Sequence, residues 1–180
     1  MESALIIRKE AKPDFESIHR IHREAFGRTA EADLVNTMRA REELLLSLVA
    51  TLGDKVVGHI AFSPISFENI PEHVMAVSLA PMAVLPNNQR QGIGTAMIRA
   101  GVIELTKTGY SSIFVLGHPE YYTKNGFTLA HKHGIVSEYP ATQNYFFCKE
   151  LQLHALRGIQ GVAKYSSAFL DISEATTRNL

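Results

Sequence analysis

The residues best suited to chemistry lie where an apolar run meets a helix. Residues 82–98 read MAVLPNNQRQGIGTAMI, in which the apolar run breaks at Pro86 and the chain passes Gly92 and Gly94 before an amphipathic stretch. Glycine lacks a Cβ, so such a turn bends sharply and lets a ligand approach the backbone. The first N–H groups of the helix point out of its positive end. This geometry predicts a site for a phosphate or pyrophosphate.

Spacing argues against two nucleotide-binding motifs at this turn. A P-loop would place Lys-Ser or Lys-Thr after the second glycine, where the chain has Thr95 and Ala96. A dinucleotide fingerprint would place a third Gly or Ala at Met97, whose side chain would crowd the contact between helix and strand. A plain tight turn into a helix stays open as the structural alternative.

A phenol and an imidazole follow further along the chain. Residues 116–127 read LGHPEYYTKNGF and contain Tyr122 and His118. A phenol, with a pKa of ~10, is protonated at neutral pH and able to donate to a leaving thiolate. The imidazole of His118 would accept the ammonium proton of a substrate, directly or through water, and Glu120 is a weaker choice for the same task. The alternatives are a packed Tyr122 with a locally bonded hydroxyl and a surface or structural His118.

The two segments together resemble the GNAT N-acetyltransferase superfamily. Gln89-Arg90-Gln91-Gly92-Ile93-Gly94 matches its Gln/Arg-x-x-Gly-x-Gly/Ala motif, and residues 121–127, YYTKNGF, match its aromatic-Tyr-x-x-x-Gly-Phe segment. Residues 116–122 and 146–151 are similar to the bacterial YhbS-like branch, in which an Asp commonly fills the place of His118. The resemblance covers roughly residues 5 to 170 and is sharpest from 80 to 127.

This resemblance implies a mixed α/β fold of GNAT type, with a central twisted sheet, a splayed parallel strand pair and helices on both faces. It implies acetyl-CoA as co-substrate, no metal, and direct transfer of the acetyl group to an amine of a small molecule, peptide or protein. Tyr122 aligns with the general acid of the family, whereas the base stays unassigned. The implied cofactor-binding residues are Met82, Ala83, Val84, Gln89, Arg90, Gln91, Gly92, Ile93, Gly94 and Thr95.

Pro81 interrupts the apolar strand that leads into the turn. A proline cannot donate to a strand ladder, so we expect a bulge or splay near it. Backbone groups around Met82 and Val84 would then be free for an extended ligand to lie beside them. Pantetheine is such an arm, and the resemblance places it there. Backbone N–H groups near Val84 would polarise the thioester carbonyl as an oxyanion site does.

The remaining pattern predicts the elements that position these segments. Periodicity and turn signals indicate strands at 4–8, 44–52, 56–62, 74–85, 112–116 and 145–151. They indicate a first helix that starts at residues 12–14, and further helices at 29–41, 91–108 and 119–125. Residues 63–73, with two prolines, are expected to form a loop. The crossover from 74 to 116 makes a parallel strand pair, and we expect the ligand at its carboxyl end.

Composition limits the classes of partner. The 180 residues fit one domain. The charges of 18 basic and 18 acidic residues cancel, so the net charge does not indicate nucleic acid or membrane as a partner. We expect a cytoplasmic protein because no secretory signal or membrane-spanning run is visible. Cys148 is the only cysteine, which we expect to be a small buried hydrophobe away from both motifs. The expected partner is an amine acceptor, and a homodimer stays open.

Other charged residues and histidines fit a surface. His19 and His22 are spaced to share a metal but lack a third ligand, so we expect a solvated helix face. His59 alternates with Ile60 and would border the acceptor cleft or solvent. We expect five arginines to be ordinary exposed charges that at most border an acceptor site: Arg20, Arg23, Arg28, Arg39 and Arg41.

A non-enzymatic function stays open beside the acetyltransferase. A CoA-binding sensor or interaction module would retain the fold and the glycine turn without chemistry. The retained Tyr122 argues against it. Within the enzyme class, an acyl donor other than acetyl-CoA is the lesser alternative.

Overall fold

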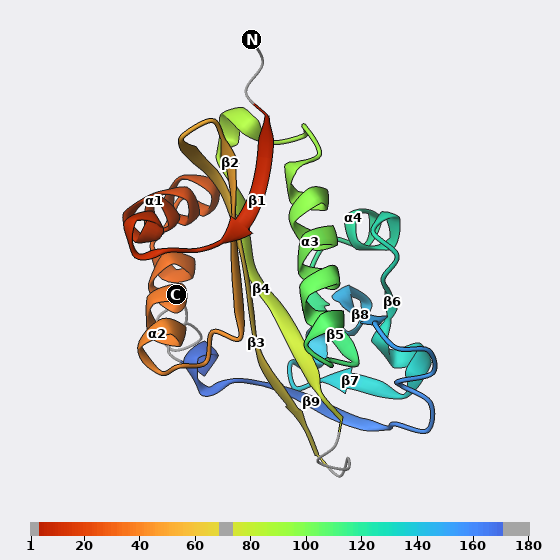
Figure 1. The fold of residues 1–180 in the computed structure, drawn as a ribbon. Coiled ribbons are helices and arrows are strands. Elements are labelled where there is room, and N and C mark those ends of the chain that lie inside the picture. Colours follow the sequence, from red (N-terminus) through yellow and green to blue (C-terminus); the bar gives the residue numbers. More distant parts are fainter. Residues whose placement is uncertain (1–3, 69–73, 171–180) are drawn as a thin grey trace. The chain divides into compact units, whose positions relative to one another are not determined.

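The computed structural model describes residues 4–68 and 74–170, which form two compact units (Figure 1). The first unit comprises residues 4–62, 81–101 and 167–170, and the second comprises 63–68, 74–80 and 102–166. Strands β3 (Lys55–Phe67) and β4 (Ala76–Val84) and helix α3 (Ile93–Lys107) contribute residues to both units. Within the described ranges, no helix combines the length and apolar character needed to cross a membrane. A single domain over residues 1–180 stays a prediction.

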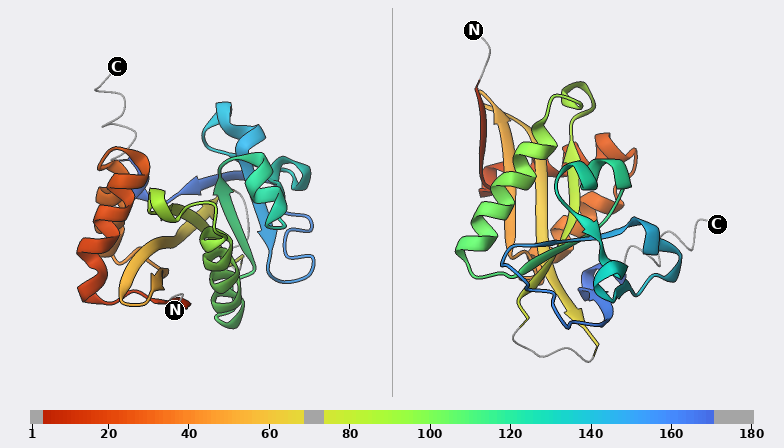
Figure 2. Two further views of the ribbon diagram at one scale, coloured as in Figure 1. Left: turned by 90° about the horizontal axis from the view of Figure 1, so that it is seen from above. Right: turned by 90° about the vertical axis from the view of Figure 1, so that its right-hand side faces the viewer.

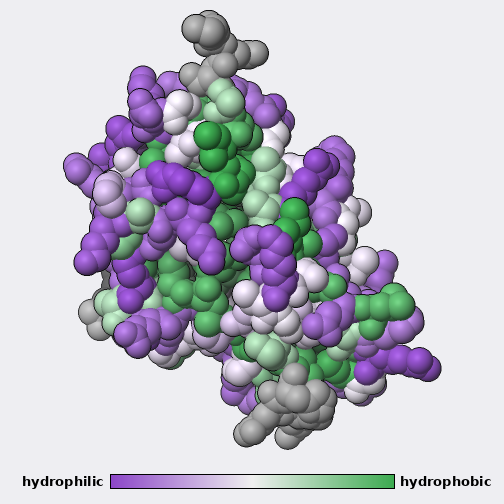
Figure 3. All heavy atoms as spheres, viewed as in Figure 1, coloured by the Kyte–Doolittle hydropathy of each residue, from purple (hydrophilic) through white to green (hydrophobic). Residues whose placement is uncertain are grey.

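Antiparallel strands form the sheet of the first unit. Strand β1 (Leu5–Lys9) pairs with β2 (Leu46–Leu52), which pairs with β3, so that Ile7 lies opposite Ala50 and Val49 opposite His59. Strand β4 follows β3 in the sheet order, and the N–H of Leu85 donates to the carbonyl of Val57 at 2.9 Å. Strand β1 ends the order, and apolar residues gather on the surface around it (Figure 3).

Helices cover both faces of this sheet (Figure 2). Helices α1 (Phe15–Phe26) and α2 (Ala30–Ala40) pack on one face, where Ile18 and Met38 share a core cluster with Val49 and Ala61. The first half of α3 packs on the opposite face. A Cβ added at Gly101 of α3 would lie 2.4 Å from the ring of Phe62, so the helix approaches β3 closely there. Alternation along the strands explains the division, because neighbouring residues point to opposite faces.

The second unit contains the parallel pair. Strand β4 pairs with β5 (Ser112–Leu116), β5 pairs antiparallel with β8 (Phe146–Glu150), and β8 pairs antiparallel with β6 (Thr128–Leu129). The pairing of β4 with β5 stops at Ser78 and Phe114, before Pro81 is reached. The predicted mixed α/β fold with a splayed parallel pair is thereby confirmed. Helix α4 (Pro119–Lys124) follows β5 directly.

Short strands not expected from the sequence complete this unit. The second half of β3 pairs antiparallel with β9 (Gly161–Tyr165), and β9 pairs parallel with β7 (Ile135–Ser137). The loop predicted for 63–73 is therefore wrong for Ser63 to Phe67, because these residues continue β3, β9 pairs with Ile65 to Phe67, and Pro64 is exposed. Residues 69–73 of that predicted loop lie outside the described residues.

The other predicted elements are confirmed with small shifts at their ends. Strand β5 has the predicted bounds, α4 ends one residue early, and α3 runs from Ile93 rather than residue 91. Gly109, which follows α3, has φ +88°, a left-handed conformation that suits glycine. These elements carry both motifs, the glycine turn in the first unit and Tyr122 in the second.

Candidate active site

The glycine turn is fastened to the end of β4. The N–H of Asn88 donates to the carbonyl of Leu85 at 2.8 Å, which closes the 3₁₀ turn Pro86–Asn88. The side-chain amide of Gln89 donates to the carbonyl of Val84 at 3.0 Å, and that of Gln91 donates to Asn87 at 3.2 Å. Two glutamine residues of the motif thus hold the turn, a structural role that the sequence did not reveal.

The turn is open and includes two residues with left-handed backbone. Gly92 has φ +81°, and an added Cβ would meet nothing within 4 Å, so glycine is needed for conformation rather than for internal packing. Arg90 has φ +63°, which is uncommon for a residue with a side chain, and its side chain is exposed. Backbone strain of this kind gathers at ligand-binding turns, where it preorganises the site.

The start of α3 fits an anion. The first helical bond joins the N–H of Ala96 to the carbonyl of Gly92 at 2.9 Å. The N–H groups of Ile93, Gly94 and Thr95 precede it, in the part of a helix that lacks acceptors of its own. The first turn of α3 carries no acidic residue, so nothing there repels a phosphate. The residues present therefore fit the pyrophosphate of CoA.

The predicted cofactor residues at the end of β4 lie just before this turn. Ala83 and Val84 are buried and Met82 is half-buried. Ala83 belongs to the core beneath α1 and α2, so its side chain is not offered to a ligand. The pairing with β5 stops at Ser78, so the backbone of β4 beyond this point is not paired with β5. An extended pantetheine arm would bind to this backbone.

Tyr122 is buried and tightly packed in the second unit. Its exposed fraction is 7%, and its ring lies edge-on to Tyr121 and Phe127, with centroids 5.2 and 5.4 Å away. A Cβ added at Gly117 would lie 2.1 Å from Cε2 of Tyr122, so the ring rests on the backbone that follows β5. The N–H of Tyr122 donates to the carbonyl of His118 at 3.2 Å, which starts α4.

The protonation states of the buried phenol and thiol follow from burial. Burial raises the pKa of Tyr122 above its ordinary value, so the phenol keeps its proton wherever an amine is a free nucleophile. It is then a hydrogen-bond donor, and a more reluctant acid than a free phenol. Burial also raises the pKa of Cys148 to about 11, which makes its thiol a poor nucleophile at neutral pH. The predicted burial of Cys148 is confirmed.

The two proposed bases lie on the surface of α4. His118 is exposed at the helix start, and Glu120 is exposed and paired with Lys124 at 2.8 Å. Neither side chain is buried in a site that would shield it from solvent. A surface histidine, the plainer of the two interpretations, agrees with this position.

A buried polar network lies beneath α1 and corrects three predictions. His22 Nε2 lies 2.7 Å from His59 Nδ1, His59 Nε2 lies 2.8 Å from the hydroxyl of Ser47, and that hydroxyl donates to Glu10 at 2.6 Å. Arg39 completes the network with two bonds to the Glu10 carboxylate, at 3.0 and 2.9 Å. His22 and His59 are 0% exposed, so the solvated face predicted for His22 and the cleft or solvent predicted for His59 are wrong. Arg39 is likewise half-buried rather than ordinary surface charge.

The directions of these bonds fix the histidine tautomers. Because Ser47 gives its proton to Glu10, it accepts from His59 Nε2, which leaves His59 Nδ1 to accept from His22 Nε2. His22 Nδ1 is then an acceptor, and it has no hydrogen-bond partner among the described residues. Burial lowers the pKa of His22 to about 2 and also lowers that of His59, so both are neutral.

The charge of Glu10 completes this network. Burial alone would raise the pKa of Glu10, but His59, Arg39 and Ser47 outweigh it and bring the pKa to about 2. Glu10 is therefore ionised beside the cationic Arg39, whose guanidinium also lies 3.8 Å from the centroid of the Phe15 ring. The network joins the residue that follows β1 to β2, β3, α1 and α2, and its composition indicates a structural role rather than a base.

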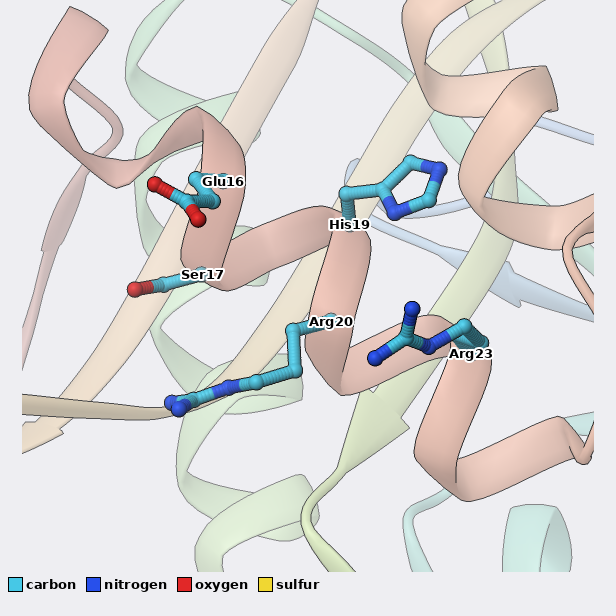
Figure 4. Close-up of a pocket in the computed structure, with 5 residues that line it drawn as sticks. All are labelled: Glu16, Ser17, His19, Arg20 and Arg23. Atoms are coloured by element: carbon cyan, nitrogen blue, oxygen red, sulfur yellow. The ribbon is translucent and has the colours of Figure 1, made fainter.

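Two pockets in the first unit lie outside the predicted cofactor residues. One, of about 420 Å³, runs along α1 and is lined by Glu16, Ser17, His19, Arg20 and Arg23 (Figure 4). The other, of about 480 Å³, lies beside the glycine turn and includes Arg20, Lys55, Leu85 and Asn88. Arg20 and Arg23 thus border pockets, as the sequence allowed. The first pocket is lined by polar and charged residues, and the second by charged, polar and apolar residues.

Comparison with known proteins identifies the family of this chain. A family model described as an acetyltransferase (GNAT) domain matches residues 44–129. "Uncharacterized N-acetyltransferase YhbS" of Escherichia coli K12 is 34% identical over 166 residues, 92% of this chain and 98% of that protein. The crystal structure of E. coli YhbS in complex with CoA aligns with a TM-score of 0.89 at 33% identity and covers 94% of each chain. A GNAT acetyltransferase from Brucella melitensis in complex with acetyl-CoA aligns with a TM-score of 0.77 at 31% identity, over 93% of this chain and 99% of that one. The chain therefore belongs to the GNAT acetyltransferase family and is similar to YhbS over most of its length.

Proposed function

We propose that this protein is an N-acetyltransferase that moves the acetyl group of acetyl-CoA directly to the amine of a small molecule, peptide or protein. The observation that carries the proposal is the open glycine turn at the start of α3, with Gly92 at φ +81° and no acid in the first helical turn. The CoA and acetyl-CoA bound by the two similar structures support it. Acetyl-CoA is a co-substrate here, and no metal takes part.

The glycine turn binds the diphosphate of the cofactor. Backbone N–H groups from Gly92 to Thr95 donate to the phosphate oxygens, and Arg90 adds a charge-assisted bond. Gln89 and Gln91 hold the turn in shape. The backbone of Met82, Ala83 and Val84 binds the pantetheine arm, and N–H groups near Val84 polarise the thioester carbonyl.

Tyr122 donates to the leaving group, the thiolate of CoA. When the amine attacks the thioester carbon, the C–N bond forms and the C–S bond breaks, which leaves a CoA thiolate and an ammonium-type nitrogen that must lose a proton. A protonated Tyr122 donates a hydrogen bond or its proton to the thiolate. Burial makes the phenol a reliable donor, because it keeps the group protonated.

The proton of the attacking amine leaves without a dedicated buried base. His118 is exposed at the start of α4, so it assists as one surface acceptor beside water. Catalysis then rests mainly on positioning the amine against the thioester, which makes the reaction effectively unimolecular. The buried, high-pKa thiol of Cys148 supports direct transfer over an acyl-enzyme.

The experiment that tests this function measures free thiol released from acetyl-CoA by the purified protein, with a panel of amines and peptides and without any acceptor. We expect at least one acceptor to raise the rate clearly above the acceptor-free rate. The alternative, a CoA-binding sensor or interaction module, predicts acetyl-CoA binding with no acceptor-dependent thiol release. A higher rate with a longer acyl-CoA would identify the donor as another acyl group.

A further inference from the structure

A lysine outside both motifs contacts the segment that carries Tyr122. Lys149 lies on β8, the strand between β5 and β6 in the second unit. Its ammonium donates to the carbonyl oxygens of Asn125 and Gly126, at 3.2 Å each. These carbonyls directly follow α4, where a helix presents the negative end of its dipole. A cation at this end of a helix stabilises it.

Helix α4 needs such a contact because it is only six residues long. Isolated helices of that length are marginal in water, so packing and caps must hold them. The local backbone bonds at its end include those from the N–H groups of Asn125 and Phe127 to the carbonyl of Tyr122, both at 3.0 Å, and from the N–H of Gly126 to the carbonyl of Thr123 at 3.0 Å. The bonds of Lys149 differ from these because they come from a strand of the sheet, and so they tie the helix end to that strand.

The absence of a side chain at Gly126 leaves room for the ammonium of Lys149. Its φ of +78° suits glycine, and an added Cβ would lie 2.7 Å from Nζ of Lys149. A side chain at this position would therefore strain the backbone and displace the ammonium. The glycine of the aromatic-Tyr-x-x-x-Gly-Phe segment thus serves the lysine contact as well as the turn.

The same ammonium also contacts an aromatic ring that packs against Tyr122. Its nitrogen lies 5.6 Å from the centroid of the Phe127 ring, within the range of a cation–π contact. The Phe127 ring is edge-on to Tyr122 at 5.4 Å, and Phe147 of β8 stacks on Tyr122 at 6.3 Å. Lys149 therefore contacts both the backbone after α4 and the ring against which Tyr122 packs.

We propose that Lys149 is a positioning residue for Tyr122. By holding Asn125, Gly126 and Phe127 against β8, it fixes the end of α4 and with it the direction of the Tyr122 hydroxyl. Loss of the ammonium frees the helix end, and the phenol then spends less time in the orientation that serves the leaving thiolate. This inference rests on the proposed role of Tyr122.

The test compares three variants in acceptor-dependent thiol release. Lys149→Met keeps the apolar stem and removes the donors, and we expect kcat to fall roughly 10–10²-fold, the range for a misplaced group, with KM for acetyl-CoA unchanged. Lys149→Arg recovers most of the rate because a guanidinium offers N–H groups to both carbonyls. Lys124→Met, at an exposed lysine of α4 itself, is the matched control and keeps the parent rate.

Two further measurements separate positioning from general damage. In a Tyr122→Phe background, Lys149→Met should lower kcat little further, whereas general damage lowers it equally in both backgrounds. Amide hydrogen exchange at Tyr122, Asn125 and Phe127 should be faster in Lys149→Met than in Lys124→Met. A Lys149→Met protein with the parent's kcat, or with equal losses in both backgrounds, overturns the proposal. If Tyr122→Phe itself keeps the parent's turnover, the role of Tyr122 fails, and unchanged exchange rates would overturn the lysine contact as well.

Discussion

The ring of Tyr122 rests directly on the backbone of Gly117. A Cβ at Gly117 would lie 2.1 Å from Cε2 and 2.8 Å from Cδ2 of that ring, distances that no packed methyl group tolerates. Gly117 has no left-handed φ, so the need for glycine here comes from contact alone. The residue that follows β5 and the phenol ring are therefore packed directly against each other.

Gly117→Ala should displace the Tyr122 ring and lower acceptor-dependent turnover roughly 10–10²-fold, the range for a group moved by about an ångström. Binding of acetyl-CoA should persist, because the glycine turn is untouched. The check is kcat together with the melting-temperature shift caused by acetyl-CoA. Gly109→Ala, which adds strain at φ +88° but meets no atom within 4 Å, is the control and should keep turnover. Full turnover in Gly117→Ala would show that the position of this ring does not matter for the reaction.

Gly94→Asp should abolish the rise in melting temperature that acetyl-CoA produces in the parent. A ligand that binds the folded state stabilises it by mass action, and a carboxylate in the first turn of α3 occupies and repels the place of the diphosphate. Thr106→Asp puts the same charge in the last turn of α3 and should keep the shift. A folded Gly94→Asp protein that shifts like the parent would mean that the diphosphate binds elsewhere.

Acid should destabilise the protein through the buried histidines. The pKa values of His22 and His59 are lowered in the fold, so the unfolded chain takes up protons first as the pH falls below their ordinary value of 6.5. Each neutral histidine then removes up to ~1.4 kcal/mol of the free energy of unfolding per pH unit. Glu10, with its lowered pKa of about 2, adds a further loss below its ordinary value of 4.5.

His22→Gln removes one of these protons and keeps a donor for His59. The slope of the free energy of unfolding between pH 6.5 and 4.5 should fall by about one proton, as measured by denaturant titration at several pH values. His19→Gln, at a partly exposed histidine of the same helix, is the control for loss of a histidine at the surface. Equal slopes in the parent and His22→Gln would contradict the neutral, buried state assigned to His22.

His118→Ala should have a modest effect on rate. The residue is exposed, and water can carry the amine proton away, so turnover should fall less than in Tyr122→Phe. In both parent and variant the rate should rise from about pH 6 to 9 as more free amine becomes available. The measurement is a pH-rate profile at saturating acetyl-CoA. A limb near pH ~6.5 that is lost in His118→Ala along with most of the rate would instead make His118 the general base.

Local signals predicted the parts of this chain that carry their own pattern. The strand, glycine turn and helix from β4 to α3, and the short helix with Tyr122, follow from glycine, proline and helical spacing within a single window. The pairing of β4 with β5 stops before Pro81, the residue from which the sequence predicted a splay. The order of elements and the family motifs then identified the fold.

Long-range partners decided what the sequence did not show. Strand β9 pairs with Ile65 to Phe67, which were expected in a loop, and no residue within that segment indicates such a partner. His22 and His59 look like surface histidines when each is seen alone, but in the core His59 bonds to both His22 and Ser47, and Ser47 donates to Glu10. Lys149 reads as ordinary charge until β8 brings it to the end of α4. Each case is a contact between segments distant in sequence.

The most direct test of the central claim measures acetylated acceptor and free thiol together, in the parent and in Tyr122→Phe, alongside acetyl-CoA binding. We predict equal amounts of the two products in the parent. In Tyr122→Phe we predict a kcat lower by roughly 10²–10⁴-fold, the range for removal of a positioned acid, with the acetyl-CoA melting shift retained. A parent protein that binds acetyl-CoA but yields no acetylated acceptor with any amine, or a Tyr122→Phe variant with unchanged turnover, would contradict the account.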